Sequence, residues 1–455
     1  MADAPAPTAS SLQEYERLTA ASQSAFVSAR ELLPTGVSRQ TLVYEPYPIY
    51  AERGAGQYLW DLDGNRYLDF VNNYTSLIHG HAYPPSVLAA AAELGRGGAL
   101  GAPTALEREY VEFLQARFPV AQQIRFALSG SEAVSYALRV ARAATGRRRI
   151  VKFEGGFHGS SDEMQQSISS PPMQPGDFSA GRPSSAGLLD VPTLVCVYND
   201  RESMRAAFEA HGEEIAAVIA EPFLGNSGLV TADPGFLSWC AELARRHGAL
   251  FILDEIQSMR LSAGGAQALH GVVPDIVALG KVMGGGMPLA CFGASAQVMS
   301  SLDGFSPAVP QTGTFNAFSA SLAAGLATMR GFGAAEIALL DRLGDLARTQ
   351  IAAVFAEAGL PVWVNGSGSM FNITTTAGPV RTYRAWKNAP TEPWQAIRMR
   401  MLADGIYITQ RGTGCLSTPM GEDDVAQLAG SLRTAIRQVP ADGRSGFTHG
   451  QPHSG

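Results

Sequence analysis

The sequence predicts an α/β protein with a large domain, built on a mostly parallel β-sheet flanked by helices, and a smaller α/β domain. Two observations predict this class. Short apolar runs alternate with helical patterns through the middle of the chain, and each run is apolar at successive positions, as in parallel strands buried on both faces. Polar or glycine-rich residues follow each run, where the ligands of open α/β sheets bind. The expected strands are residues 123–128, 150–153, 216–220, 249–253 and 276–279.

A helix is expected between the first two of these strands, from Glu132 to Thr145. Its apolar residues Val134, Leu138 and Ala141 are four and three positions apart, which puts them on one helical face. Gly146 follows as a stop signal. Later in the chain, residues 159–190 are rich in Ser, Pro and Gly. Loops of this length are usually functional lids or disordered segments.

The length of 455 residues indicates two or three domains. We expect a large domain over residues 66–330 and a small domain over residues 331–440, with residues 12–65 packing beside the small domain. The two ends, residues 1–11 and 441–455, lack periodicity and are expected to be disordered.

Composition argues against several function classes. Lys and Arg total 34 and Asp and Glu total 41, which gives a net charge of −7 and argues against nucleic-acid wrapping or binding to an anionic membrane. No apolar stretch reaches the ~18 residues of a membrane span, and the first residues lack a signal-peptide pattern. The four cysteines form no C-x-x-C pair, which indicates reduced thiols. We therefore expect a cytoplasmic protein.

The first expected strand runs into Ser129, Gly130, Ser131 and Glu132. A glycine-containing turn that opens a helix offers unpaired backbone N–H groups and the positive end of the helix dipole, which together can bind a phosphate. The same residues also fit a simple helix cap, because Ser129 followed by Glu132 has the spacing of a capping box. No nucleotide P-loop or dinucleotide fingerprint is present.

Two further strand ends carry chemically distinctive residues. Strand 249–253 is followed by Asp254, which suits a metal ligand, a general base, a partner for a cation or a helix cap. Strand 276–279 is followed by Gly280, Lys281 and a glycine run. Most lysines are solvated, but desolvation or nearby positive charge lowers the lysine pKa and exposes a nucleophilic amine.

Together, a phosphate cradle, an aspartate and a lysine are what pyridoxal 5'-phosphate (PLP) requires. The phosphate would bind at Gly130 and Ser131, and Asp254 would keep the pyridine nitrogen protonated. The protonated ring then acts as an electron sink. Lys281 would hold the aldehyde as a Schiff base and later move a proton between substrate and cofactor carbons.

The chain resembles the class III, fold-type-I PLP-dependent aminotransferases, in the branch of glutamate-1-semialdehyde aminomutase and the β-amino-acid (β-phenylalanine) aminotransferases. The resemblance extends from about Leu33 to Leu432. The motifs that carry it are YLWDLDGNRYLDF (58–70), SGSEA (129–133), KFEGGFHG (152–159), EPFLGNSG (221–228), DEIQ (254–257), LGKVMGGGMP (279–288) and TGTFN (312–316).

This resemblance implies roles around the cofactor. Lys281 matches the Schiff-base lysine, and Asp254 matches the partner of the ring nitrogen. Phe157 stands where the family usually has a tyrosine, so ring stacking is expected without the phenol hydroxyl. Ile256 matches the residue on the other ring face, and Asn226 matches the residue that hydrogen-bonds to the cofactor's phenolic oxygen. The other residues assigned to the cofactor site are Ser129, Gly130, Ser131, His158, Glu221 and Gln257.

Gly313 and Thr314 match a phosphate-binding pair that the family supplies from the neighbouring subunit. The resemblance therefore implies a homodimer with two active sites at its interface. His79 and His81 flank Gly80, but no third metal ligand lies nearby in the sequence, so we expect structural roles and no metal site.

Two arginines bear on the reaction. Arg39 aligns with the arginine that β-amino-acid aminotransferases use for the substrate carboxylate, whereas Leu42 stands where the aminomutase has its carboxylate arginine. Arg411 matches an Arg-Gly pair of the β-phenylalanine and phenylglycine aminotransferases. A guanidinium suits bidentate carboxylate binding, although surface or ion-pairing roles remain open for both. Tyr74 is expected to form a side wall of the substrate pocket. These residues favour transamination between a β- or aromatic amino acid and a 2-oxo acid.

Two alternatives stay open. The motifs KFEGGFHG and EPFLGNSG, and GGAQ at 264–267, are very close to the aminomutase sequence, and the loop after Gly159 resembles its mobile lid. Intramolecular amine transfer is therefore the second hypothesis. A non-catalytic PLP-fold protein is the third, and the presence of Lys281 and Asp254 argues against it. Donor, acceptor, stereochemistry and pathway do not follow from the sequence.

Overall fold

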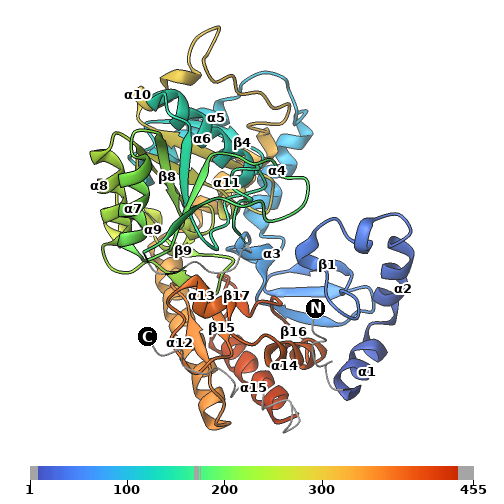
Figure 1. Ribbon diagram of the computed structural model, residues 1–455. Coiled ribbons are helices and arrows are strands. Elements are labelled where there is room, and N and C mark those ends of the chain that lie inside the picture. Colours follow the sequence, from blue (N-terminus) through green and yellow to red (C-terminus); the bar gives the residue numbers. More distant parts are fainter. Residues whose placement is uncertain (1–8, 169–173, 175, 439–455) are drawn as a thin grey trace. The chain divides into compact units, whose positions relative to one another are not determined.

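The computed structural model describes residues 9–168, 174 and 176–438, and it contains two compact units (Figure 1). One unit comprises Pro84–Ala338 and Arg381–Lys387, and the other comprises Met1–Tyr83, Leu339–Val380 and Asn388–Gly455. The domain boundaries at 65/66 and 330/331 stay predictions, whereas these units meet at 83/84 and 338/339. Helix α1 begins at Ala9, inside the stretch 1–11 expected to be disordered. Residues 1–8 and 441–455 lie outside the described part.

The larger unit is built on an eight-stranded sheet, which confirms the α/β class. Strands β5, β7, β8, β11 and β12 form parallel pairs, while β13 is antiparallel to both neighbours and β6 is antiparallel to β7. In sheet order the strands are β4 (Gln123–Ala127), β13 (Ala290–Ala294), β12 (Ile276–Leu279), β11 (Leu250–Asp254), β8 (Ile215–Ala220), β5 (Arg149–Phe153), β7 (Thr193–Cys196) and β6 (Phe178–Ala180). A separate pair consists of β9 (Phe223–Leu224) and β10 (Val230–Thr231).

All five predicted strands are present, but β4 departs from the expected environment. It lies at an edge of the sheet, pairs antiparallel with β13, and leaves Gln123 and Arg125 exposed. A strand at the edge of a sheet is less completely covered than a central one, so some of its side chains can be polar and exposed. The central strands β8 and β12 are buried at every position, as predicted.

Helices surround this sheet (Figure 1). The helices of the larger unit are α4 (Pro84–Gly95), α5 (Ala105–Arg117), α6 (Gly130–Thr145), α7 (Arg201–His211), α8 (Phe236–Arg246), α9 (Gly265–His270), α10 (Ala296–Met299), α11 (Ser319–Arg330) and α13 (Tyr383–Lys387). Helix α12 (Ala334–Glu357) contains the boundary between the units. Short 3-10 turns are η3 (Ser258–Leu261), η4 (Lys281–Gly284) and η5 (Ser300–Leu302).

Helix α6 positions the start of the site. It begins at Gly130, two residues before the predicted start, and Gly146 ends it in a left-handed conformation with φ 68°. The predicted face of Val134, Leu138 and Ala141 is buried in the core that contains the sheet. Burial of this face against the sheet fixes where the helix N-terminus points.

The smaller unit holds two sheets. One is β1 (Ala51–Ala55), β2 (Tyr58–Asp61), β3 (Arg66–Asp69) and β16 (Ile406–Tyr407), and the other is β14 (Trp363–Asn365), β15 (Met370–Thr374) and β17 (Thr413–Cys415). Its helical elements are α1 (Ala9–Leu18), α2 (Ala20–Ala29), η1 (Pro34–Gly36), η2 (Gln40–Leu42), α3 (Asn72–Thr75), α14 (Glu392–Ala403) and α15 (Glu422–Gln438).

The first and last parts of the chain share the core of this unit. Strand β16 pairs in parallel with β3, and tyrosines of the N-terminal segment pack with α14. The buried members of this cluster are Tyr15, Tyr44, Tyr47, Ile49, Tyr67, Met399 and Leu402. No helix in the part of the chain that the structure describes is long and apolar enough to cross a membrane.

Candidate active site

The residues predicted to bind the phosphate lie at the N-terminus of α6. Ser129 Oγ accepts a hydrogen bond from the backbone N–H of Glu132 at 3.3 Å. The Glu132 carboxylate accepts from the N–H of Leu128 at 2.8 Å and not from the capping residue itself, so only half of the capping box forms. A hollow of about 350 Å³ opens here, lined by Leu128, Ser129, Ser131, Glu132, Ser135, Ser160 and Ser161. Hydroxyl groups at a helix N-terminus suit a phosphate.

Ile256 packs over two glycines of the site. A Cβ on Gly130 would lie 2.6 Å from Ile256 Cδ1, and a Cβ on Gly280 would lie 3.2 Å from Ile256 Cγ2. A side chain at Gly130 would therefore require Ile256 to shift, and one at Gly280 would contact it tightly. Ile256 lies two residues after the end of β11 and contacts both Gly130, at the start of α6, and Gly280, which precedes Lys281. Its assignment to a face of the cofactor ring remains a prediction, and this placement agrees with it.

Asp254 is the last residue of β11, and its carboxylate is held at both oxygens. Oδ2 lies 2.8 Å from His158 Nδ1, and Oδ1 accepts from the N–H of Ile256 at 3.1 Å. Asp254 and His158 are 5% and 2% exposed. These two contacts and burial fix the orientation of the carboxylate. A carboxylate that pairs with a protonated ring nitrogen must be oriented in this way.

Lys281 begins η4, two residues after the end of β12, in a left-handed conformation with φ 49°. Its side chain is partly buried. Burial lowers the pKa of the Lys281 amine, while the carboxylates of Asp254 and Glu221 act to raise it. Strands β11 and β12 are parallel neighbours, with Asp254 opposite Ala278. The amine and both carboxylates therefore share one electrostatic environment at the carboxyl edge of the sheet.

Glu221 follows β8 at the same edge and organises the neighbouring loops. Oε2 accepts from the N–H of Phe157 at 2.9 Å, and Oε1 accepts from the N–H of Gly225 at 3.1 Å. Burial raises the pKa of Glu221 to about 7, and His158 opposes this rise. Glu221 thus fixes the backbone of Phe157, whose ring is 40% exposed. An exposed aromatic ring is suited to stacking on a planar ligand.

The other predicted cofactor residues have less defined surroundings. Asn226 is partly buried between β9 and β10. The Gln257 side chain packs against Gly225, where a Cβ would overlap its Oε1. Gly313 and Thr314 are exposed, and neither is among the described residues that line the hollow. For these four residues the binding roles remain predictions.

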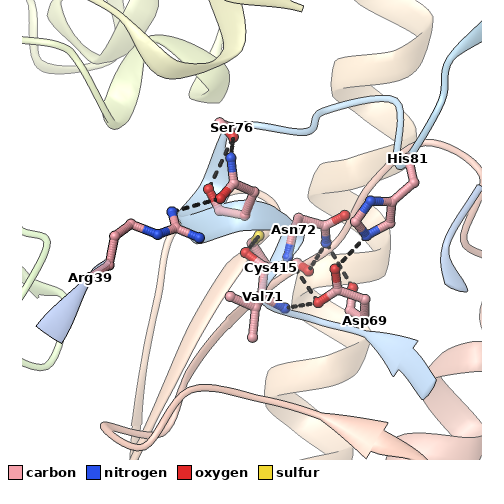
Figure 2. A network of polar contacts seen from close by, with 8 residues as sticks. Arg39, Asp69, Val71, Asn72, Ser76, His81 and Cys415 are labelled. Carbon is pink, nitrogen blue, oxygen red and sulfur yellow. Dashed lines mark hydrogen bonds and ion pairs between the residues drawn. The ribbon is translucent and has the colours of Figure 1, made fainter. Parts of the chain in front are cut away.

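The predicted substrate residues lie in the smaller unit, and the structure brings Arg39 and Tyr74 together; Figure 2 shows Arg39. Arg39 Nη1 donates to Asn73 Oδ1 at 3.0 Å, and the Arg39 guanidinium carbon is 5.7 Å from the centre of the Tyr74 ring. Arg411 is exposed between β16 and β17, and its carbonyl accepts from Asn372 Nδ2 at 2.7 Å. Carboxylate binding by either arginine remains a prediction.

The histidines that flank Gly80 contact other side chains of the same unit. His79 Nδ1 is 2.8 Å from Thr418 Oγ1, and His81 Nε2 is 2.7 Å from Asp69 Oδ2. Within the described residues, no group of three or more His, Cys, Asp or Glu side chains is arranged to hold a metal ion.

Sequence reasoning missed Asn73, Ser160, Ser161 and Lys152. Asn73 carries the contact to Arg39, and the Asn-Asn pair at 72–73 was a usable signal because asparagine tolerates left-handed backbone. Lys152 is 0% exposed, and its amine donates to the carbonyls of Met164 and Gln166. Burial lowers the pKa of Lys152 to about 7.

Comparison with known proteins decides the family, because the class-III aminotransferase model matches residues 41–420. The chain belongs to the class-III aminotransferases. Curated relatives include glutamate-1-semialdehyde 2,1-aminomutases from Myxococcus xanthus, 36% identical over 93% of this chain and 99% of the relative, and from Chloroflexus aurantiacus, 38% identical over 91% and 96%.

Solved structures of this family are equally similar. An omega-transaminase from Sphaerobacter thermophilus is 39% identical with a TM-score of 0.87, covering 92% of this chain and 97% of that one. The β-phenylalanine aminotransferase from Variovorax paradoxus is 33% identical with a TM-score of 0.86, covering 94% and 96%. A transaminase solved with PLP bound is 34% identical with a TM-score of 0.87, covering 94% and 99%.

The donor set of this chain fits the cofactor of the family. Three groups lie at one edge of the sheet: the serine-lined N-terminus of α6, the buried carboxylate of Asp254, and the Lys281 amine with its lowered pKa. The chain is therefore a PLP-dependent enzyme of the class-III aminotransferase family.

Proposed function

We propose that this enzyme transfers an amino group from an amino acid to a 2-oxo acid and that Arg39 binds the carboxylate of the amino acid. The observation that carries this proposal is the uncompensated charge of Arg39. Its contacts are a neutral amide oxygen of Asn73 and the ring of Tyr74, and no ion pair among the described residues involves it. An exposed guanidinium without a carboxylate partner is available to a substrate carboxylate.

The residues of the sheet edge supply the chemistry. Ser129, Gly130 and Ser131 would hold the phosphate of PLP, and Lys281 would hold its aldehyde carbon. Asp254 would hold the proton on the ring nitrogen. When bound, PLP supplies an electron sink for the substrate carbon. Burial lowers the pKa of the Lys281 amine, which favours its use as a base, so Nζ would accept and return a substrate proton.

Phe157, Ile256 and Asn226 would orient the cofactor ring. Phe157 offers an exposed aromatic face, and Ile256 lies beside the cradle glycine. Glu221, His158 and Gln257 would act through these groups by fixing backbone and carboxylate positions.

A homodimer is part of the proposal. Thr314 is exposed in the single chain, and the adjacent Phe315 and the nearby Phe305 are large exposed apolar side chains at 49% and 110%. Apolar exposure of this kind suits an interface, and a partner subunit would bring its Thr314 to the phosphate. Sedimentation of the full chain tests this, and a monomer at working concentration would contradict it. We also propose a cytoplasmic location, which the four free cysteines support.

Intramolecular amine transfer is the second candidate, and the curated aminomutases at 36–38% identity favour it. Leu42 argues against it, because an apolar side chain stands where the aminomutase has its carboxylate arginine. The test supplies one amino substrate without an oxo acid. A transaminase converts its cofactor once to the amine form and stops, whereas an aminomutase continues and releases an isomer. Continuous isomerisation of glutamate 1-semialdehyde would overturn the first proposal.

The substrate class is tested with α-, β- and ω-amino acids, each paired with pyruvate or 2-oxoglutarate. We expect the highest kcat/KM for a β- or aromatic amino acid. Arg39→Ala should raise KM for that substrate mainly, because a group that binds ground and transition states equally affects KM and not kcat. An unchanged KM would remove Arg39 from the site.

A further inference from the structure

Four consecutive non-glycine residues of α3 adopt left-handed backbone. Asn72, Asn73, Tyr74 and Thr75 have φ values of 47°, 46°, 55° and 74°. Left-handed backbone costs roughly 1–2 kcal/mol for an ordinary residue and less for asparagine, so Tyr74 and Thr75 carry most of the strain in this run of four. Strain of this kind persists only where surrounding contacts enforce it, and it concentrates at functional sites.

Asp69 enforces the turn (Figure 2). Its Oδ1 accepts from the N–H groups of Val71 and Asn72 at 2.7 and 3.0 Å, while Oδ2 pairs with His81 Nε2 at 2.7 Å. The Asn72 amide donates to the carbonyls of Asp69 and Cys415 at 2.9 and 3.0 Å. Asp69 is 2% exposed and Asn72 is 0% exposed. A buried, charge-assisted network therefore locks the start of the turn.

The middle of the turn holds Arg39 on two sides. Asn73 Oδ1 accepts from Arg39, while Asn73 Nδ2 donates to Ser76 Oγ at 3.1 Å (Figure 2). The Tyr74 hydroxyl donates to the Thr41 carbonyl at 2.6 Å, and its ring lies near the Arg39 guanidinium. The left-handed backbone directs these two consecutive side chains to one guanidinium. With right-handed φ values they would leave in other directions.

We propose that this left-handed turn is a positioning device for Arg39 and that Asn73 is the residue that fixes the orientation of the guanidinium toward the substrate carboxylate. The inference rests on the proposed function, in which Arg39 binds that carboxylate. Asn73 is neutral, so it orients Arg39 through one N–H and leaves the positive charge and the remaining donors for the substrate. An aspartate at this position would accept the same hydrogen bond but neutralise the charge.

The test compares two amino donors that differ in one group. The donors are 3-amino-3-phenylpropanoate and 1-phenylethylamine, which lacks the carboxylate, and the enzyme is the full-length holoenzyme. For Asn73→Asp we expect KM for the carboxylate donor to rise about tenfold or more, with kcat and the amine donor within about twofold of wild type. Asn73→Gly keeps the left-handed backbone without strain and removes the acceptor, so a smaller rise in the same KM is expected.

Ala82→Gly is the matched control, because Ala82 also has positive φ, 50°, outside the turn. It should leave both donors unchanged. Binding of 3-phenylpropanoate, which cannot react, is measured by calorimetry on the same proteins and should weaken in the same order. Equal losses for both donors in Asn73→Asp would overturn the inference. If Arg39→Ala raises KM for the carboxylate donor alone and Asn73→Asp does not, the positioning role of Asn73 is wrong while the role of Arg39 stands. If Arg39→Ala is not selective, the role of Arg39 fails as well.

Discussion

His158 Nδ1 lies 2.8 Å from Asp254 Oδ2, and both side chains are buried. The histidine follows Phe157 on the loop after β5, whereas the aspartate ends β11, so one hydrogen bond ties two strand ends of the sheet. Asp254 receives its second contact from the N–H of Ile256. Because both oxygens are occupied, the carboxylate has one orientation before any ligand arrives, which lowers the ordering cost of binding.

Loss of the His158 contact should weaken PLP binding. His158→Phe leaves a buried carboxylate with one hydrogen bond fewer, and bonds to charged groups contribute about 1.5–3 kcal/mol. We expect the Kd for PLP to rise about ten- to a hundredfold, measured by titration of the apo-protein, and His158→Gln to recover part of the loss. His79→Gln is the control, because His79 lies in the smaller unit and contacts Thr418. Wild-type affinity in His158→Phe would contradict this role.

The packing of Ile256 over Gly130 should appear as coupling between the two positions. Gly130→Ala puts a methyl group 2.6 Å from Ile256 Cδ1, and overpacking of this kind costs about 1–3 kcal/mol. We expect weaker PLP binding in Gly130→Ala and partial recovery when Ile256→Val removes Cδ1. A double-mutant cycle on the Kd for PLP measures the coupling. Additive effects of the two substitutions would rule out the contact.

Glu255 should make stability fall as pH rises. Its carboxylate is buried and accepts from the N–H groups of Ala266 and Gln267 at 2.9 and 2.6 Å. Burial raises its pKa from 4.5 to about 7. Between these values the folded protein holds a proton that the unfolded chain releases, so stability declines from about pH 4.5 to pH 7, by about 3 kcal/mol at most.

Glu255→Gln cannot ionise, so this part of the decline should disappear. The measurement is the difference in free energy of unfolding between pH 5 and pH 8 for wild type and variant, by urea titration. A variant with the same pH dependence as wild type would show that Glu255 does not titrate in this range.

The half-buried Arg384 and the buried Arg398 should differ in their importance for stability. Arg384 Nε lies 3.2 Å from Glu154 Oε1, and the glutamate side chain is 4% exposed. Arg384→Met removes the guanidinium from a buried carboxylate and should cost about 3 kcal/mol. Arg398 is 2% exposed over the ring of Tyr44, 4.6 Å from its centre, and takes part in no ion pair with a described residue.

Arg398→Met therefore leaves no carboxylate uncompensated and should change stability by about 1 kcal/mol or less. Urea unfolding of both variants at one pH makes the comparison. Equal losses in free energy of unfolding for the two variants would mean that the Glu154 carboxylate does not account for the cost of losing Arg384.

The sequence predicted those features that depend on local pattern. The five predicted strands, the buried face of α6 and its end at Gly146 follow from apolar spacing and one glycine. Lys281 and Asp254 were found because they follow apolar strands, and parallel strands bring their carboxyl ends to one edge.

Features that depend on tertiary arrangement were beyond reach. The pairing of β4 with β13 joins segments far apart in the chain, and no periodicity encodes it. The Arg39–Asn73 contact joins residues 34 positions apart, and no local pattern states which residue the turn faces. The closeness of Ile256 to Gly130 likewise emerges only when β11 and α6 are packed.

The central claim is that the Lys281 amine holds the cofactor, and the chain makes this claim easy to test because it contains only three lysines, Lys152, Lys281 and Lys387. Lys152 is buried with a lowered pKa, and Lys387 is exposed, so each is an internal control. The measurement is peptide mass spectrometry after borohydride reduction of the PLP-loaded protein. The account predicts the added cofactor mass on the peptide that contains Lys281. Cofactor mass on the Lys152 or Lys387 peptide instead, or on none, would contradict it.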